Sequence, residues 1–253
     1  MNLDNQKWYD KPVTKIILIT ISLTWMIPYV GFVLSSFRNE QAVKRYAWWN
    51  SISSGTILEE LTFANYTEIL FAENLSRSFF NSFAVTIPST IIPITIAAFA
   101  AYAFAFIDFR GKDIAFLFVV AMMIVPLQMS LIPLLKLMKS GAILFGIPLV
   151  PELNINGTFV AVWFAHTGFG LPLATFQFLW VYNDFLVANV FLGINPRNMV
   201  VTSHVAQLTV GNYGEAWHLR TSGAVISMIV PLIVFFSLQR FFIRGLIGGA
   251  VKG

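Results

Sequence analysis

The chain has 253 residues, of which 57% are hydrophobic and only 11% are charged, with a formal net charge of +4. Soluble domains carry roughly a quarter charged residues, so this composition excludes an ordinary soluble protein and indicates that lipid surrounds much of the chain. The sequence contains no cysteine, which excludes disulfides and thiolate catalysis, and its small positive charge gives no indication of a nucleic-acid partner.

Four apolar segments are long enough to cross a bilayer, whose hydrocarbon core of about 30 Å needs about 20 helical residues. We predict membrane-spanning helices at 16–37, 79–107, 114–135 and 221–238. Pro88 and Pro93 are expected to kink the second of these helices. Asn81, near its start, is expected to cap the helix or to bond a neighbouring helix rather than to bind a ligand. The polar segment 38–78 is predicted to be external.

A fifth apolar run, 159–192, has an unusual length. It contains 34 residues, and Asp184 is its only charged residue. As one helix it would extend roughly 50 Å, which is too long for one span, yet it is too short for two ordinary spans with a turn. The GFGLP sequence at 168–172 favours a break in the helix. A single long, tilted helix is the alternative.

The basic residues predict the orientation of the chain in the membrane. They cluster before the first span, in the short loop between the second and third spans, and after the last span: Lys7, Lys11, Lys15, Arg110, Lys112, Arg240, Arg244 and Lys252. By the positive-inside rule, both termini and the short loop are predicted to be cytoplasmic. Both termini can lie on one side only if the number of crossings is even. The run 159–192 is therefore expected to cross twice or to form a re-entrant hairpin.

Several motifs occur in a fixed order along nearly the whole chain. They are LTFANYTEIL (61–70), SRSFFNSFAVTIPST (76–90), AAYAFAFIDFRGKD (100–113), IVPLQMSLIPLLKLM (124–138), HTGFGLPLATF (166–176), FQFLWVYNDFLVANVFL (176–192), GNYGEAW (211–217) and RGLIGGAVKG (244–253). In this order and spacing the chain resembles the permease subunit of bacterial carbohydrate ABC importers, the MalG-like branch of the binding-protein-dependent importers. The resemblance implies an all-α, polytopic helical membrane protein of nominally six spans. It would form a single transmembrane permease domain, 1–253, in the bacterial cytoplasmic (inner) membrane.

One family motif is missing. Members of this family carry a cytoplasmic loop between their fourth and fifth spans, with the pattern Glu-Ala-Ala, three residues, Gly and a later Pro, and this loop docks on the ATPase subunit. In this chain LPLATF, which resembles the end of the fourth span, continues directly into QFLWVYNDF, which resembles the fifth. The joint falls near Phe176–Gln177. We therefore expect spans four and five to be fused or truncated within 159–192, and coupling to the ATPase to be impaired.

The resemblance implies a permease subunit of an ATP-driven sugar importer, embedded in membrane lipid. Its implied partners are a second permease subunit, two ATPase subunits and an extracytoplasmic sugar-binding protein. The chain has no Gly-x-x-x-x-Gly-Lys-Ser/Thr loop, so ATP is expected on a partner and no cofactor on this chain. Its three histidines have no metal-ligand spacing, and no enzyme site is visible. The alternative is a non-transporting degenerate paralogue or a truncated membrane protein.

Five residues are candidates for the substrate pathway. Asn183 and Asp184 form a polar pair in an apolar run; Asp184 could line an aqueous pathway, make a structural contact between spans, or lie at a membrane interface. Trp180 and Tyr182 could stack on a sugar ring, although interfacial belts are the commoner use of such residues. Gln128, between two prolines of the third span, could bond sugar hydroxyls or serve in helix packing.

Overall fold

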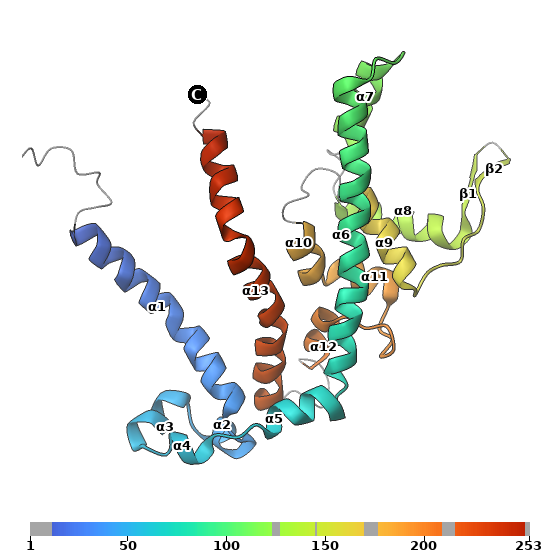
Figure 1. Cartoon of the computed structure of the whole chain (residues 1–253). Helices are drawn as coiled ribbons and strands as arrows, with labels where there is room; N and C mark the ends of the chain where they lie inside the picture. Colours follow the sequence, from blue (N-terminus) through green and yellow to red (C-terminus); the bar gives the residue numbers. More distant parts are fainter. Residues whose placement is uncertain (1–11, 123–126, 145, 170–176, 209–215, 251–253) are drawn as a thin grey trace, which may run out of the picture. The chain divides into compact units, whose positions relative to one another are not determined.

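The structure is a computed structural model that describes residues 12–122, 127–144, 146–169, 177–208 and 216–250. These residues are helical except for loops and one short β-hairpin (Figure 1), which confirms the predicted all-α membrane class. The chain divides into two compact units. The first unit comprises residues 1–73 and 208–226, and the second comprises 74–207 and 227–253.

The first unit is built around one long apolar helix and a set of short ones. The long helix has apolar side chains on all sides. Only 6% of its most apolar 18-residue stretch is buried, as expected for a helix that faces lipid. The short helices follow it and end in a π-helical turn, Glu68–Ala72, and the unit also contains the start of the last helix. The helices are α1 (Pro12–Phe37), α2 (Glu40–Arg45), α3 (Trp48–Ser54), α4 (Ile57–Glu60), α5 (Ala64–Thr67) and, up to residue 226, α13 (Trp217–Ala250).

A buried arginine holds the short helices together. Arg38, directly after α1, is only 1% exposed. Its Nε donates to Glu60 Oε2 at 2.6 Å, and its Nη2 donates to the carbonyl oxygens of Ala42 and Tyr46, each at 3.1 Å, and to Ser51 Oγ at 2.7 Å. A buried charge is tolerated only when it is paired and hydrogen-bonded, and this set meets both needs. One side chain thus joins α2, α3 and α4 to the end of α1.

A second set of hydrogen bonds attaches α5 and α13 to the same place. Asn65 Nδ2 donates to the carbonyl oxygens of Ser36 (2.9 Å) and Arg38 (2.8 Å). The hydroxyls of Ser36 and Tyr66 are 2.6 Å apart, and Ser222 Oγ donates to the Ser36 carbonyl at 3.0 Å. The Asn-Tyr pair of the LTFANYTEIL motif therefore fixes the polar segment to the end of α1.

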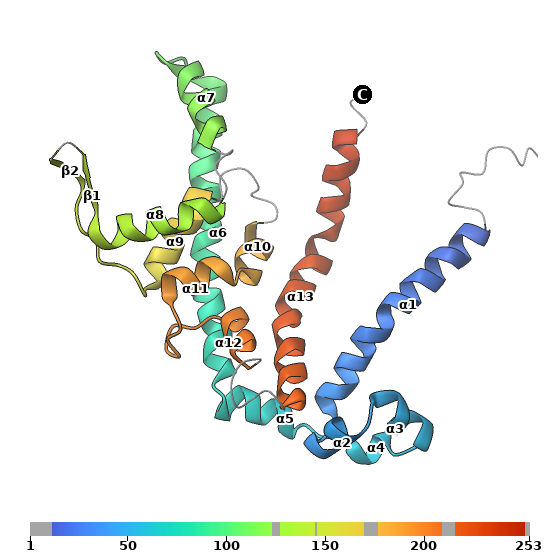
Figure 2. The ribbon, with the colours of Figure 1, turned by 180° about the vertical axis from the view of Figure 1, so that it is seen from behind.

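The second unit is organised around α6 (Leu75–Phe106), a helix of 32 residues. Three later helices, α9, α10 and α12, pack on α6, and α11 packs on α9 (Figures 1 and 2). Their apolar core includes Val85, Val162, Val181 and Phe191. The remaining elements are α7 (Lys112–Met122), α8 (Leu127–Ser140), the antiparallel strands β1 (Ala142–Leu144) and β2 (Ile147–Val150), α9 (Phe159–Phe169), α10 (Gln177–Asn183), α11 (Leu186–Leu192) and α12 (Val201–Gln207).

The predicted spans can be compared with these helices. Within the described residues three helices are long and apolar enough to cross a bilayer, namely α1, α6 and the part Trp217–Gln239 of α13. They coincide with the spans predicted at 16–37, 79–107 and 221–238. The segment predicted as a span at 114–135 is divided between α7 and α8, which lie on either side of residues 123–126.

The apolar run 159–192 contains three helices, α9, α10 and α11, in its described part. Because α11 packs back against α9, the run does not follow one straight helical axis. The predicted break at 168–172 and the joint near Phe176–Gln177 fall mainly on residues 170–176, outside the described residues.

Candidate functional site

Helix α10 separates the predicted pathway residues onto two faces. Trp180 is 40% exposed, and Asn183, one turn later on the same face, is also exposed. Tyr182 is only 2% exposed, and its ring lies against Phe83 of α6 (centroids 6.0 Å apart) and Phe178 (6.2 Å). A solute could therefore reach Trp180 and Asn183, whereas Tyr182 belongs to the packed interior.

Asp184 lies where α10 ends and has a local and a long-range contact. Its Oδ1 accepts hydrogen bonds from the backbone N–H groups of Leu186 (3.1 Å) and Val187 (3.2 Å), which caps the start of α11. Its Oδ2 lies 3.3 Å from Nε2 of His166 on α9, within ion-pair distance but outside hydrogen-bond alignment. Both side chains are more than nine-tenths buried. The one acid of the apolar run therefore starts one helix and approaches another.

A stripe of small polar residues on α6 was not predicted from the sequence. Its members are spaced by four, four and three residues, lie on one face of the helix and are all almost fully buried: Ser78, Ser82, Thr86 and Ser89. The first two attach α12, since Ser78 Oγ is 2.8 Å from His204 Nδ1 and Ser82 Oγ accepts from the backbone N–H of Val201 at 2.8 Å. The spacing of these polar residues within an apolar run could have revealed this face.

The other end of the stripe faces α10. Gln177 Nε2 donates to the carbonyl oxygen of Ser89 at 3.4 Å. Within the described residues, Thr86 Oγ1, Ser89 Oγ, Gln177 Oε1 and the Tyr182 hydroxyl are buried without a hydrogen-bond partner. Each such group costs about 1–3 kcal/mol unless it is paired, so this contact between α6 and α10 is polar and incompletely satisfied.

Two other predicted residues have different positions. Gln128 lies in the first turn of α8, and its side chain is outside the described residues. Asn81 Nδ2 donates to the carbonyl oxygens of Arg197 (3.1 Å) and Met199 (2.9 Å), which holds the segment before α12 against α6. The contact is structural, but it joins α6 to a loop and is neither the helix cap nor the bond between helices that was predicted for Asn81.

The chemistry available to these residues is binding rather than reaction. The exposed amide of Asn183 can bond a polar solute, and the exposed indole of Trp180 can stack on it. Among the described residues, no group of three or more His, Cys, Asp or Glu side chains is placed to hold a metal ion.

Comparison with known proteins identifies relatives along nearly the whole chain. No protein-family model matches it. The osmoprotective compounds uptake permease protein GgtD of Synechocystis is 35% identical, over 99% of this chain and 95% of that protein. The alpha-glucoside transport system permease protein AglG of Rhizobium meliloti is 40% identical over 79% of this chain and 63% of that protein. A probable ABC transporter permease protein of Pyrococcus horikoshii is 30% identical over 95% of this chain and 97% of that protein.

The match with GgtD also shows a difference in length. It extends over 297 aligned positions, whereas 99% of this chain is about 250 residues. About 47 aligned positions of the relative therefore have no counterpart in this chain.

Proposed function

Since this chain belongs to the permease family of carbohydrate ABC importers, it is a membrane-spanning subunit of an ATP-driven sugar importer, and we propose that the exposed face of α10 contacts the sugar. The observation that carries the function is a match over 99% of this chain and 95% of a transport permease. Because the relatives are transport permeases, the non-transporting alternative is not favoured. Transport permeases are not enzymes. The protein is a multi-pass protein of the inner membrane.

Membership of the family implies ATPase and binding-protein partners. The finer composition that we propose is a second permease subunit, two ATPase subunits that carry the ATP, and an extracytoplasmic sugar-binding protein. We also propose that both termini are cytoplasmic. The basic residues that flank the first and last spans support that orientation.

Two exposed side chains support the proposed sugar contact. The indole of Trp180 presents a flat apolar surface to a sugar ring, and the amide of Asn183, one turn away, can bond its hydroxyls. Asn183 Nδ2 donates to the Leu179 carbonyl at 2.8 Å, which leaves the amide oxygen as an acceptor. In this proposal Tyr182 and Asp184 hold α10 in place from behind, and Gln128 is a further pathway candidate on α8.

The contact can be tested by measuring uptake of labelled sugar in cells that contain the partner subunits. We expect Trp180→Ala to raise the apparent KM about tenfold, equivalent to about 1.4 kcal/mol, and Trp180→Phe to restore much of the affinity. Leu186→Ala is the matched control, because Leu186 is similarly exposed but has no polar or aromatic group. Equal KM values for Trp180→Ala and Leu186→Ala would count against the proposed contact.

We further propose that coupling to the ATPase is weakened, because about 47 positions of the relative have no counterpart here. The test compares this chain with a form in which a family-like cytoplasmic loop is inserted after Phe176. We expect sugar accumulation and co-purification of the ATPase to increase with the insertion. Normal accumulation by the chain without the loop would refute impaired coupling, while leaving the assignment as a permease intact.

A further inference from the structure

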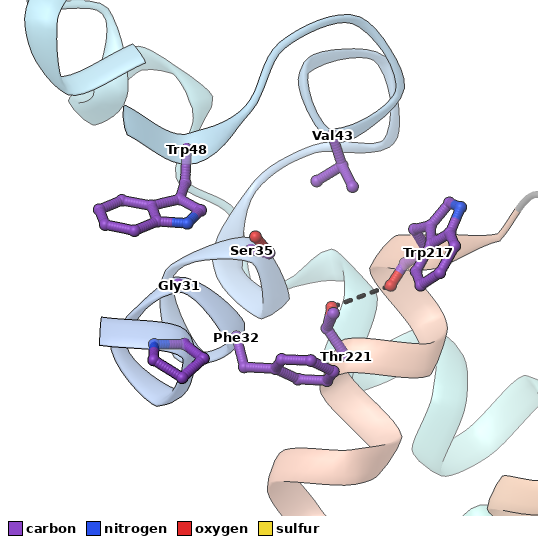
Figure 3. A pocket seen from close by; sticks show the side chains of 8 residues that line it. Gly31, Phe32, Ser35, Val43, Trp48, Trp217 and Thr221 are labelled. Atoms are coloured by element: carbon purple, nitrogen blue, oxygen red, sulfur yellow. Dashed lines mark hydrogen bonds between the residues drawn. The ribbon is translucent and has the colours of Figure 1, made fainter. Parts of the chain in front are cut away.

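The first unit contains an open cleft of about 320 Å³ between α1 and the start of α13 (Figure 3). Phe32 of α1 and Thr221 of α13 lie on one side of it. Trp48, at the start of α3, lies against Gly31, and Trp217, at the start of α13, lies across the cleft with Val43 between the two. We propose that this cleft binds one phospholipid of the surrounding bilayer, with its glycerol–phosphate region between the two tryptophans.

The polarity of the cleft changes along the axis of α1. Its lining on α1 extends from Pro28 to Ser35, a distance of about 10 Å along a helix. Pro28 and Phe32 form the apolar end, and Ser35 lies two residues before α1 ends and the polar segment begins. A phospholipid has the same sequence of an apolar chain followed by a polar glycerol–phosphate region. Trp217 is the first residue of the apolar part of α13, and membrane proteins accumulate tryptophan where their spans begin.

The shape of the cleft depends on two close contacts. Gly31 of α1 lies directly against the indole of Trp48, and a Cβ at position 31 would collide with the indole nitrogen. On the opposite side, Thr221 Oγ1 donates to the Trp217 carbonyl at 2.9 Å, which satisfies the hydroxyl within its own helix (Figure 3). The hydroxyl of Thr221 therefore needs no hydrogen-bond partner from the occupant of the cleft.

A positive charge lies beside Trp217. The guanidinium carbon of Arg220 is 5.0 Å from the centroid of the Trp217 ring, and its Nε donates to the Leu208 carbonyl at 2.8 Å. Arginine recognises phosphate well because its planar group presents several donors at once. We expect Arg220 to attract the lipid phosphate to this end of the cleft.

The surface that continues from the cleft indicates lipid as the occupant. Along α1 the side chains that flank the lining residues are large, apolar and mostly exposed, including Ile27 and Tyr29. A helix with apolar side chains on every side faces lipid when it crosses a membrane. The cleft therefore extends a lipid-facing surface, so a lipid chain can enter it sideways. This inference rests on the protein's place in the membrane and not on its sugar contacts.

Native mass spectrometry of the full chain can test the site by measuring retained lipid. We expect one phosphatidylglycerol to remain bound, whereas diacylglycerol with the same acyl chains should be retained at least tenfold less. Ser35→Phe, which fills the cleft, should reduce phosphatidylglycerol retention about tenfold. Val30→Phe, the control on the opposite face of α1, should leave it unchanged. Equal retention of lipid by these two variants would overturn the proposal.

Arg220 provides the test of the phosphate contact. Arg220→Gln should lower phosphatidylglycerol retention several-fold and leave diacylglycerol retention unchanged, whereas Arg220→Lys should retain most of the preference for the phospholipid. Cross-linking by a photoactivatable phospholipid needs no substitution and therefore does not depend on the folding of a variant. We expect adducts to concentrate on residues 28–35 and on Trp48. Adducts spread evenly along α1, or equal retention of the two lipids by the unaltered chain, would contradict the site.

Discussion

Replacing Arg38 by methionine should loosen the polar segment after α1 without affecting the second unit. The change keeps most of the side-chain volume but removes the charge and all four hydrogen bonds that Arg38 donates. Breaking a buried ion pair by removing one partner costs about 3–5 kcal/mol. Because the Glu60 side chain is 12% exposed and can be partly rehydrated, we expect about 3 kcal/mol. That energy corresponds to roughly a hundredfold change in the local opening equilibrium.

Hydrogen–deuterium exchange of the purified protein is the appropriate measurement, because it reports local opening segment by segment. The amides of α2 to α4 should exchange about a hundredfold faster in Arg38→Met, while α6 should be unchanged. Lys44→Ala is the matched control. Lys44 forms an exposed pair with Glu40 at 2.7 Å, and such pairs contribute about 0.3–0.5 kcal/mol, or about twofold in exchange. If Arg38→Met changed exchange no more than Lys44→Ala, the structural role given to Arg38 would be wrong.

Three further predictions concern single groups. Desolvation raises the pKa of Glu60, but hydrogen bonds led by that from Arg38 outweigh it and leave the pKa below its ordinary 4.5. The stabilisation of the folded state by ionised Glu60 should be complete above pH 4.5 and disappear as the pH falls through the lowered pKa. In exchange measurements, Glu60→Gln should abolish this pH dependence. Asp184→Ala should lower thermal stability by about 1 kcal/mol more than Asp184→Asn, which keeps a capping oxygen; equal melting shifts would contradict the cap. Ser82→Ala should leave the buried N–H of Val201 unpaired, cost about 1–3 kcal/mol and accelerate exchange in α12; unchanged exchange there would argue against this bond.

The sequence predicted the elements of this protein better than its contacts. Hydropathy alone predicted helices at the positions of α1, α6 and the start of α13, because an uninterrupted apolar run of some 20 residues is typical of a membrane-spanning helix. The roles within WVYND were harder to predict. Trp180 and Tyr182 lie two residues apart and look equally suited to sugar stacking, yet only Trp180 is accessible. Residues two apart point to different sides of a helix, and the position of α6 decides which side is buried.

Long-range polar contacts could not be inferred from local patterns. In the sequence, Arg38 is one of several basic residues in a segment that carries both signs of charge. In the structure it is buried and donates hydrogen bonds to Ser51 and to Glu60, which lies 22 residues later. Similarly, only the structure shows that Ser78, the first residue of the polar stripe on α6, contacts His204, which is 126 residues away in the chain. Such pairs leave no periodicity in the chain, because their separation depends on how the intervening helices fold back.

The sequence by itself therefore determined that lipid surrounds much of this protein, that the protein is helical and, through its ordered motifs, to which family it belongs. These properties depend on composition and on the spacing of residues along the chain, both of which can be read without knowledge of the fold. Only the tertiary structure decided that Asp184 caps a helix and approaches His166, that Tyr182 is buried while Trp180 is accessible, and that Gly31 and Trp48 shape a cleft beside α13. Each of these depends on which helices lie next to one another, and that arrangement is set by packing between segments far apart in the chain.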